Sequence, residues 1–370
     1  MSVAPLDEHL VDELCRAAVS ERGDPDVVVR AHLRRVAPLA GTLDGERLVR
    51  AAVARLDGLG ALDPLLADPT VDEVLVNAHG DVWVERDGRM NRCGHLGPAE
   101  LAVVTERILA PLGRRLDRAN PIVDARLADG SRVCAVIPPV SPDGACLSVR
   151  RFRDRSLGLE AFAPDALVAV LELLVAARSN VVVSGATSSG KTSLLNATLG
   201  RCPPGERIVT IEDTVELLPA ADHLVRLEAR PPTPDGPAPI SLEQLVRTAL
   251  RLRPDRLVVG EVRGPEVLAL VQALNTGHDG SWSTCHANSA LDALHRLETL
   301  VIQAAPAWPL TAVREHLTRS IDAVVHVARH HDGSRRVVEV GEVVVDRDRL
   351  GLRPIADASR VVGQLTRLRT

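Results

Sequence analysis

The sequence contains very few aromatic residues. Of its 370 residues, two are Phe, three are Trp and none is Tyr, whereas 45% are hydrophobic. The protein cores must therefore be built from Val, Leu, Ile and Ala. Binding of single-stranded nucleic acid by base stacking needs aromatic platforms, and the net charge of −5 provides no general basic field for DNA. We therefore expect no direct nucleic-acid partner.

Cysteine pairs and long apolar runs are also missing. The six cysteines are scattered without a C-x-x-C pair, which argues against a zinc module or a disulfide framework and suits a reducing cytosol. The first residues are acidic and lack the apolar segment of a signal peptide. No apolar run approaches the about 18 residues that a membrane-spanning helix needs. The sequence predicts a cytoplasmic protein without a transmembrane segment, bound peripherally to the inner face of the membrane through partners.

Lysine occurs once, at Lys191, within the segment GATSSGKT at residues 185–192. This segment fits the P-loop pattern, follows a short apolar run and precedes a helical pattern. The planar fork of an arginine cannot replace a compact ammonium inside so tight a loop. The spacing predicts that backbone N–H groups and the start of the helix bind a polyphosphate. The predicted nucleotide-binding residues are Gly185, Ala186, Thr187, Ser188, Ser189, Gly190, Lys191, Thr192 and Ser193.

A nucleoside triphosphate and Mg²⁺ are the cofactors that this loop implies; the resemblance given below implies that the nucleotide is ATP. Lys191 would reach the β- and γ-phosphates, and the Thr192 hydroxyl would bind Mg²⁺. An apolar segment that begins at residue 254 ends in a single carboxylate, Glu261. This is the arrangement of a Walker B strand, and it predicts that Glu261 holds Mg²⁺ through water.

Further candidate residues follow predicted strands. Glu212 and Glu216 lie in TIEDTVE (residues 210–216), where a carboxylate can orient or deprotonate an attacking water. His278 and His286 flank a short strand, and we expect them near the γ-phosphate. Among many arginines, Arg150 and Arg230 are the ones we expect to neutralise phosphate charge, by analogy with arginines that accelerate phosphoryl transfer.

The hydrophobic periodicity predicts three parts. Residues 1–62 have helical spacing and form a helical lead-in, and residues 63–155 alternate as antiparallel strands around one helix, an α+β domain. Residues 156–370 alternate between short apolar strands and helices. This predicts a P-loop domain with a mostly parallel sheet and helices on both faces, and the resemblance given below implies that the domain is RecA-like. The Pro- and Gly-rich segment at residues 231–239 is predicted to be a mobile loop.

Together these segments resemble the secretion-superfamily ATPases of type II and type IV secretion and pilus assembly. Four ordered segments carry the resemblance: residues 185–192 are similar to the Walker A segment, 211–216 to the aspartate box, 253–264 to Walker B, and 276–289 to the histidine box. The segments DARLADGSR (124–132) and AVIPP (135–139) resemble the TadA/CpaF branch, which drives assembly of tight-adherence (Flp) pili. The absence of a four-cysteine zinc module disfavours some type II relatives.

The resemblance implies a hexameric ring with ATP between the N- and C-terminal domains, and an inner-membrane platform protein as partner. It implies that Glu216 orients or activates water, that Glu261 serves the Mg²⁺ shell, that His278 and His286 line the γ-phosphate side, and that Arg150 and Arg230 reach phosphate. Three alternatives stay open. They are a conjugative type IV secretion ATPase that serves DNA transfer, a nucleotide-gated scaffold with little turnover, and a small-molecule P-loop kinase, which the aspartate and histidine boxes disfavour.

Overall fold

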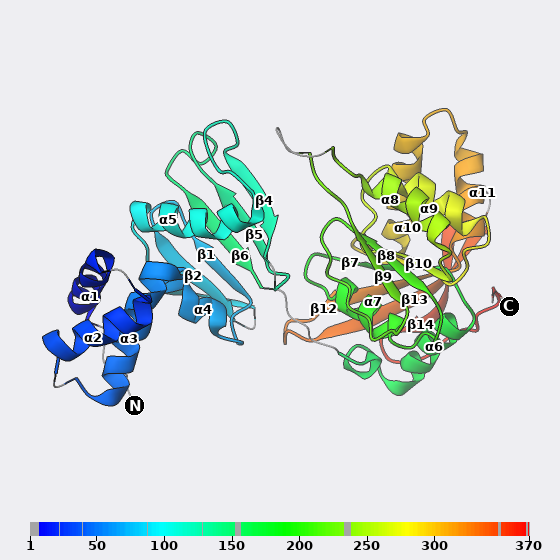
Figure 1. Cartoon of the computed structure of the whole chain (residues 1–370). Coiled ribbons are helices and arrows are strands. Elements are labelled where there is room, and N and C mark those ends of the chain that lie inside the picture. Colours follow the sequence, from blue (N-terminus) through cyan, green and yellow to red (C-terminus); the bar gives the residue numbers. More distant parts are fainter. Residues whose placement is uncertain are drawn as a thin grey trace. The chain divides into compact units, whose positions relative to one another are not determined.

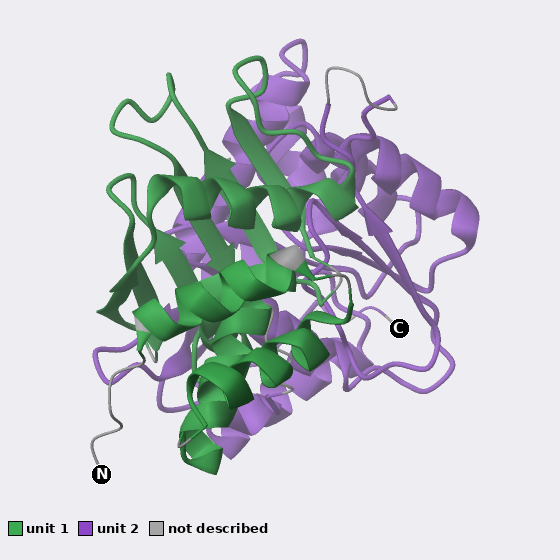
Figure 2. Cartoon of the chain, turned by 60° about the vertical axis from the view of Figure 1, so that its left-hand side comes forward, with its two compact units in different colours: residues 1–153 green, residues 154–370 purple. Residues whose placement is uncertain are grey.

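The computed structural model describes residues 7–21, 23–38, 40–86, 88–127, 129–151, 157–232, 238–346, 349–367 and 369. The chain divides into two compact units, residues 1–153 and 154–370, which Figure 2 shows in separate colours. Part of the predicted mobile loop at residues 231–239 lies outside the described residues. In the part of the chain that is described, no helix has both the length and the apolar character needed to cross a membrane.

Unit 1 begins with helices that have a core of their own. Apolar side chains of α1 to α3 pack together, among them Val11, Leu14, Val29 and Val49. They are spaced three or four residues apart along each helix, and this spacing places them on one face. The helices are α1 (Glu8–Ser20), α2 (Pro25–Val36) and α3 (Thr42–Asp57), and α1 and α2 begin at the capping residues Asp7 and Asp24.

A six-stranded antiparallel sheet forms the rest of unit 1, in the order β3-β2-β1-β6-β5-β4. In β1, buried and more exposed side chains alternate, so Val74 and Val76 face the core while Glu73 and Leu75 lie on the other face. Helix α5 (Pro98–Leu109) contributes Leu101, Val104 and Ile108 to the same core. The remaining elements are η1 (Gly60–Leu62), α4 (Asp63–Ala67), β1 (Glu73–Val76), β2 (Asp81–Arg86), β3 (Arg89–His95), η2 (Ala110–Leu112), β4 (Ile122–Arg126), β5 (Arg132–Val136) and β6 (Cys146–Arg150).

Unit 2 is built on an eight-stranded sheet in the order β14-β13-β12-β7-β11-β10-β8-β9 (Figure 1). Neighbouring strands pair in parallel from β12 through β7, β11, β10 and β8 to β9. The pairs β12-β13 and β13-β14 are antiparallel. The strands are β7 (Val181–Gly185), β8 (Ile208–Glu212), β9 (Leu224–Glu228), β10 (Arg256–Val259), β11 (Trp282–His286), β12 (Ala323–Arg329), β13 (Arg335–Asp346) and β14 (Arg349–Asp357).

Helices cover both faces of this sheet. Alternate strand residues enter two separate cores: Val182, Ile211 and Val259 pack on one face, and Val183 and Val258 pack on the other. The first core includes side chains of α8 to α11, and the second includes those of α6 and α7 (Figure 1). The helices are η3 (Leu159–Ala161), α6 (Asp165–Ala176), α7 (Lys191–Leu199), α8 (Leu242–Ala249), η4 (Leu250–Leu252), α9 (Glu266–Leu274), α10 (Ala290–Ala304) and α11 (Leu310–Ser320).

The predicted fold class is confirmed. Two strands were not predicted, β3 and β14, and both lie at the edge of a sheet. All seven residues of β3 are exposed, so this strand lacks the alternation of buried and exposed residues that identifies a strand in a sequence. The three-part division at residues 62 and 155 stays a prediction, supported by the separate core of α1 to α3.

A buried carboxylate, Asp322, joins the start of β7 to the C-terminal segment. Asp322 is 2% exposed and accepts a hydrogen bond from the backbone N–H of Asn180 (2.8 Å). Arg369 donates to both of its oxygens, Nε to Oδ2 at 2.6 Å and Nη2 to Oδ1 at 3.1 Å. Arg367 Nη2 lies 3.5 Å from Oδ1. Because a buried charge is costly unless it is paired and hydrogen-bonded, the C-terminal segment is part of the fold of unit 2.

We predict that Arg369→Ala lowers the free energy of unfolding by about 2 kcal/mol, because it leaves Asp322 with less compensation in a buried place. Chemical denaturation of the full chain measures this change. The matched control is Arg360→Ala, in the same segment, since Arg360 is 77% exposed and forms only a surface pair with Asp357. Equal effects of the two substitutions would contradict the role given to Arg369.

Candidate nucleotide site

The P-loop connects the end of β7 to the first turn of α7, as predicted. Two of its residues have a left-handed backbone, Ser188 with φ 59° and Gly190 with φ 99°. A Cβ atom at Gly185 would lie 2.4 Å from both Ser189 Oγ and the Val327 carbonyl oxygen, so this position has room only for glycine. The loop therefore folds tightly over the end of the sheet, and α7 begins at Lys191 with its N–H groups directed out of the helix.

The ammonium of Lys191 is folded into this loop. Its Nζ donates to the carbonyl oxygens of Gly185 (3.0 Å) and Ala186 (2.8 Å) and lies 3.3 Å from His286 Nδ1. The residue is 6% exposed. An ammonium has three N–H donors and no acceptor, so each donor has one partner.

His286 bridges Lys191 and Glu261. The other ring nitrogen, Nε2, lies 3.3 Å from Glu261 Oε2. Because the ammonium can only donate, Nδ1 must accept, and Nε2 then carries the hydrogen that is directed at the carboxylate. The three side chains form a row in which an acid, an imidazole and the P-loop cation are in contact.

Backbone hydrogen bonds on both sides hold Glu261 at this place. It follows β10 by two residues, where the N–H of Gly260 donates to the Ile211 carbonyl and the N–H of Val262 donates to the Thr284 carbonyl, both at 2.8 Å. The carboxylate itself is 36% exposed. Glu261 is thus fixed through its backbone while its side chain can still reach solvent.

Glu212 and Glu216 occupy different places. Glu212 is 4% exposed, and its Oε1 accepts the backbone N–H groups of Glu216 (2.9 Å) and Leu217 (3.0 Å). It therefore shapes the turn after β8. Glu216 is half-buried and raises the pKa of Lys191 through space. This geometry gives Glu212 a positioning role and leaves Glu216 as the carboxylate beside the loop.

The pKa of Lys191 is lowered from its ordinary value because burial disfavours the charged form. The charges of Glu261 and Glu216 act in the opposite direction, together with Cys285. Negative groups at the mouth of the P-loop thus help to keep its ammonium protonated.

Within unit 2, the structure does not bring two of the predicted residues, His278 and Arg230, to the P-loop. His278 precedes β11, contacts the Ala273 carbonyl through Nδ1 (3.1 Å), and lies at the opposite edge of the sheet from His286. Five strand residues separate the two edges, a length of roughly 16 Å. The expectation that both histidines line one γ-phosphate site stays a prediction, and His286 is the one of the two that contacts the P-loop lysine in this structure.

Arg230 is the second of these residues, while Arg150 belongs to unit 1. Arg230 follows β9, four strand positions from β7, and its Nε donates to the Ala238 carbonyl (2.9 Å). At about 4.8 Å per strand, this is roughly 19 Å from the P-loop, too far for the side chain to reach it. Arg150 is exposed at the end of β6 in unit 1.

Sequence analysis missed His326 on β12. Its Nδ1 lies 2.9 Å from the Ser184 hydroxyl, one residue before the P-loop, and the side chain is buried. Burial lowers the pKa of His326 from 6.5; Asp292 acts to raise it and Lys191 to lower it further. No sequence pattern identifies such a residue, since its place depends on the parallel pairing of β12 with β7.

This lowered pKa predicts how stability depends on pH. The unfolded chain gains a proton at this position near pH 6.5, before the folded chain does, so the free energy of unfolding should fall as the pH drops below about 6.5. His326→Gln keeps a hydrogen-bonding group without the titration, and the loss of stability between pH 7.5 and 5.5 should become smaller. Urea denaturation of both proteins at the two pH values measures the difference. An unchanged pH dependence would contradict this role.

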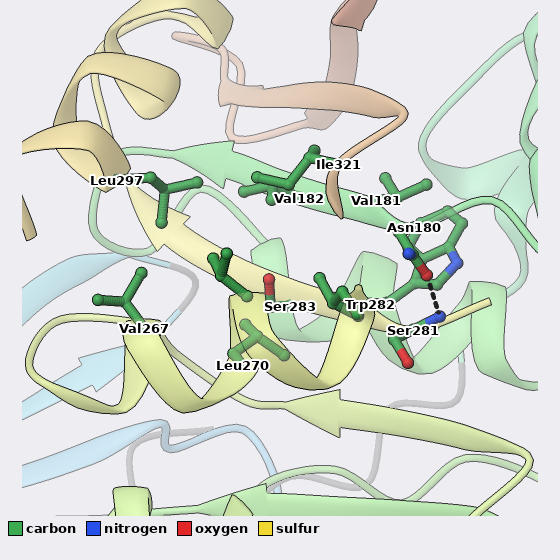
Figure 3. Close-up of a pocket in the computed structure, with 12 residues that line it drawn as sticks. Asn180, Val181, Val182, Val267, Leu270, Ser281, Trp282, Ser283, Leu297 and Ile321 are labelled. Atoms are coloured by element: carbon green, nitrogen blue, oxygen red, sulfur yellow. Dashed lines mark hydrogen bonds between the residues drawn. The ribbon is translucent and has the colours of Figure 1, made fainter. Parts of the chain in front are cut away.

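A pocket inside unit 2 is lined by residues outside the P-loop (Figure 3). Its walls are mostly aliphatic, with Val267 and Leu270 from α9 and Leu297 from α10 around β7 and β11. Its polar Asn180 already accepts the Ser281 N–H at 3.0 Å, the dashed line in Figure 3. These residues belong to the core, and none of the residues that line the pocket is charged.

Comparison with known proteins decides the family. A family model described as type II/IV secretion system protein matches residues 55–354. The chain belongs to this family. The predicted superfamily of secretion proteins is thereby confirmed, while the TadA/CpaF branch stays a prediction.

Relatives and solved structures agree with this assignment. A putative conjugal transfer protein of Mycobacterium tuberculosis is 41% identical over 305 residues, which cover 79% of this chain and 86% of the relative. Conjugal transfer protein TrbB of Rhizobium radiobacter is 35% identical over 295 residues, 77% of this chain and 87% of that protein. The ATPase DotB of Legionella pneumophila has a similar fold, with a TM-score of 0.55 and 20% identity over 75% of this chain and 78% of that chain.

The residues of this type II/IV secretion protein fit a nucleoside triphosphate with Mg²⁺. The buried hydroxyl of Ser189 has no hydrogen-bond partner within the described residues, and it belongs to the loop whose N–H groups would hold the phosphates. Lys191 would contact the phosphates, while the Thr192 hydroxyl and the Glu261 carboxylate are oxygen donors of the kind that Mg²⁺ prefers and would hold it. When bound, Mg²⁺ would neutralise phosphate charge.

Proposed function

We propose that this type II/IV secretion protein is a Mg²⁺-dependent ATPase that drives a secretion or pilus machine. The observation that carries the proposal is the contact row Lys191–His286–Glu261 at the mouth of the P-loop. A carboxylate and an imidazole at this point can detect a bound γ-phosphate by exchanging contacts with Lys191. Glu216, whose charge acts on Lys191, would orient or deprotonate the attacking water in this proposal.

The proposal includes a ring of six chains with ATP bound between the N- and C-terminal domains. The register of unit 1 supports a phosphate-directed role for Arg150. Arg126, Arg132 and Arg150 stand on one rung of neighbouring strands β4, β5 and β6. The rung continues with Glu73 on β1, the neighbour of Arg150, so three guanidinium groups stand beside one carboxylate, and their positive charge favours a phosphate group. His278 and Arg230, which cannot reach the P-loop of their own chain, can take part only if a neighbouring chain completes the site.

Specific Mg-ATPase activity measured against protein concentration tests the ring, with Lys191→Ala as the blank. If sites are completed between chains, activity per chain should rise with concentration and level off as the ring forms. Sizing at the same dilutions identifies the species present. Full activity of a monomer would contradict the ring, and no activity above the blank with ATP still bound would favour a nucleotide-gated scaffold.

Glu261→Gln should reduce turnover at least 100-fold and leave ATP affinity within about threefold of the wild type, since the amide keeps the size of the side chain but removes its charge. Steady-state ATPase rates and titration with ATP measure the two effects. Glu243→Gln in α8 is the control, because within the described residues the carboxylate of Glu243 pairs with Arg247, which is 66% exposed. Equal losses of binding and turnover in Glu261→Gln would contradict its role.

The relatives favour conjugative transfer as a specific second candidate beside Flp pilus assembly. Two of them are named as conjugal transfer proteins, whereas the segments at 124–132 and 135–139 resemble the TadA/CpaF branch. Both candidates require a membrane platform protein as partner. Deletion of the gene, followed by electron microscopy of surface pili and a plasmid-transfer assay, separates them, because each candidate predicts loss of only one of the two activities.

A further inference from the structure

Arg335, the first residue of β13, lies against the P-loop although it is 144 positions from Lys191 in the sequence. Its Nε donates to the carbonyl oxygen of Ser188 at 3.3 Å. A Cβ atom at Gly190 would lie 2.7 Å from Arg335 Cδ and 3.3 Å from its Cβ, so the aliphatic part of the arginine packs over this glycine. Arg335 thus contacts both P-loop residues that have a left-handed backbone.

The peptide group between Ser188 and Ser189 is held at both ends. Its C=O, from Ser188, accepts the hydrogen bond from Arg335. The N–H of Ser189 donates to the Ala186 carbonyl at 3.3 Å. Because the C=O of Ser188 and the N–H of Ser189 belong to one planar unit, Arg335 and Ala186 fix this unit from opposite sides. The Ala186 carbonyl also accepts from Lys191 Nζ (2.8 Å). A short chain of contacts therefore leads from Arg335 to the P-loop lysine.

We propose that Arg335 is a positioning residue for nucleotide binding. It holds the 188–189 peptide group so that the P-loop keeps the shape that binds phosphates before the nucleotide arrives. A left-handed conformation at a residue other than glycine is costly, and Ser188 keeps it because the surrounding contacts hold it there. Preorganisation of this kind lowers the cost of binding, so its loss weakens affinity more than turnover. This inference rests on the proposed ATPase function.

The test compares Arg335→Met with Arg336→Met. Methionine keeps the aliphatic stem that covers Gly190 and removes the donor. Arg336 is the next strand residue, is exposed, and projects from the opposite face of β13, which makes it a matched control. The Kd of ATP and of ADP is measured by calorimetric titration of the full chain with Mg²⁺ present, and kcat and KM are measured by steady-state assay.

Arg335→Met should raise the Kd of both nucleotides about tenfold, which corresponds to ~1.4 kcal/mol, and should leave kcat within about twofold of the wild type. Arg336→Met should stay within about twofold in both quantities. An unchanged Kd in Arg335→Met, or a loss confined to kcat, would overturn the proposal.

Arg335→Lys is the second variant, in case methionine impairs folding, and it separates geometry from charge. Lysine keeps the charge but cannot place a donor where Nε lies, so its Kd should rise at least threefold. Wild-type affinity in Arg335→Lys would show that charge alone matters and would overturn the positioning role. The Lys191→Ala variant separates a failure of the proposed ATPase function from a failure of the positioning role of Arg335. If wild type and Lys191→Ala bind nucleotide equally, the proposed function fails; if only the Arg335 variants match the wild type, this inference alone fails.

Discussion

The buried ammonium of Lys191 is the constraint on which the nucleotide site depends. A cation that is 6% exposed requires acceptors for all three of its N–H groups. Two of them are carbonyls of the P-loop, which can face inward only because Gly185 permits a close approach of the loop to Ser189 and Val327. The third is His286. The loop, the lysine and the end of β11 therefore form one unit, and a change in any of them changes the others.

The order of the parallel strands brings the remaining groups to this unit. β7, β11, β10 and β8 are neighbours, and each ends at the same edge of the sheet. Lys191 follows β7, His286 ends β11, Glu261 follows β10, and the turn that contains Glu216 follows β8. Because these residues follow four separate strands, no single segment contains the site. Its geometry depends on the sheet topology, which in turn depends on alternating apolar residues that fill the two cores.

Much of this arrangement could be predicted from the sequence, because strand ends are visible in it. A carboxylate or histidine that directly follows an apolar strand must lie at the C-terminal edge of a parallel sheet, and this rule located Glu212, Glu261 and His286. The same rule fails for His278, which precedes its strand and so lies at the other edge. Arg230 stands beside the Pro- and Gly-rich segment at residues 231–239, and nothing in the local sequence shows that four strand positions separate it from β7. Arg335 and His326 lie near the P-loop only through β12 and β13, whose pairing is set by contacts distant in the sequence.

Buried charges have different roles at the N-terminal and C-terminal ends of the parallel strands in unit 2. At the N-terminal edge, Arg256 is fully buried, pairs with Glu206 and donates to the Val175 carbonyl, while Asp322 is paired with Arg369. These groups have complementary partners within the chain and hold the strands in place. At the C-terminal edge, Lys191 shares its surroundings with two acids, one of them 36% exposed, and with a bridging histidine. Contacts at this edge can be exchanged for those of a polyphosphate, because a phosphate oxygen can replace a carbonyl, a ring nitrogen or a carboxylate as the partner of an ammonium. The pairs Arg256–Glu206 and Arg369–Asp322 stabilise the fold at the N-terminal ends of the strands. The fold therefore does not depend on the contacts of Lys191 at the C-terminal ends, where a polyphosphate would bind.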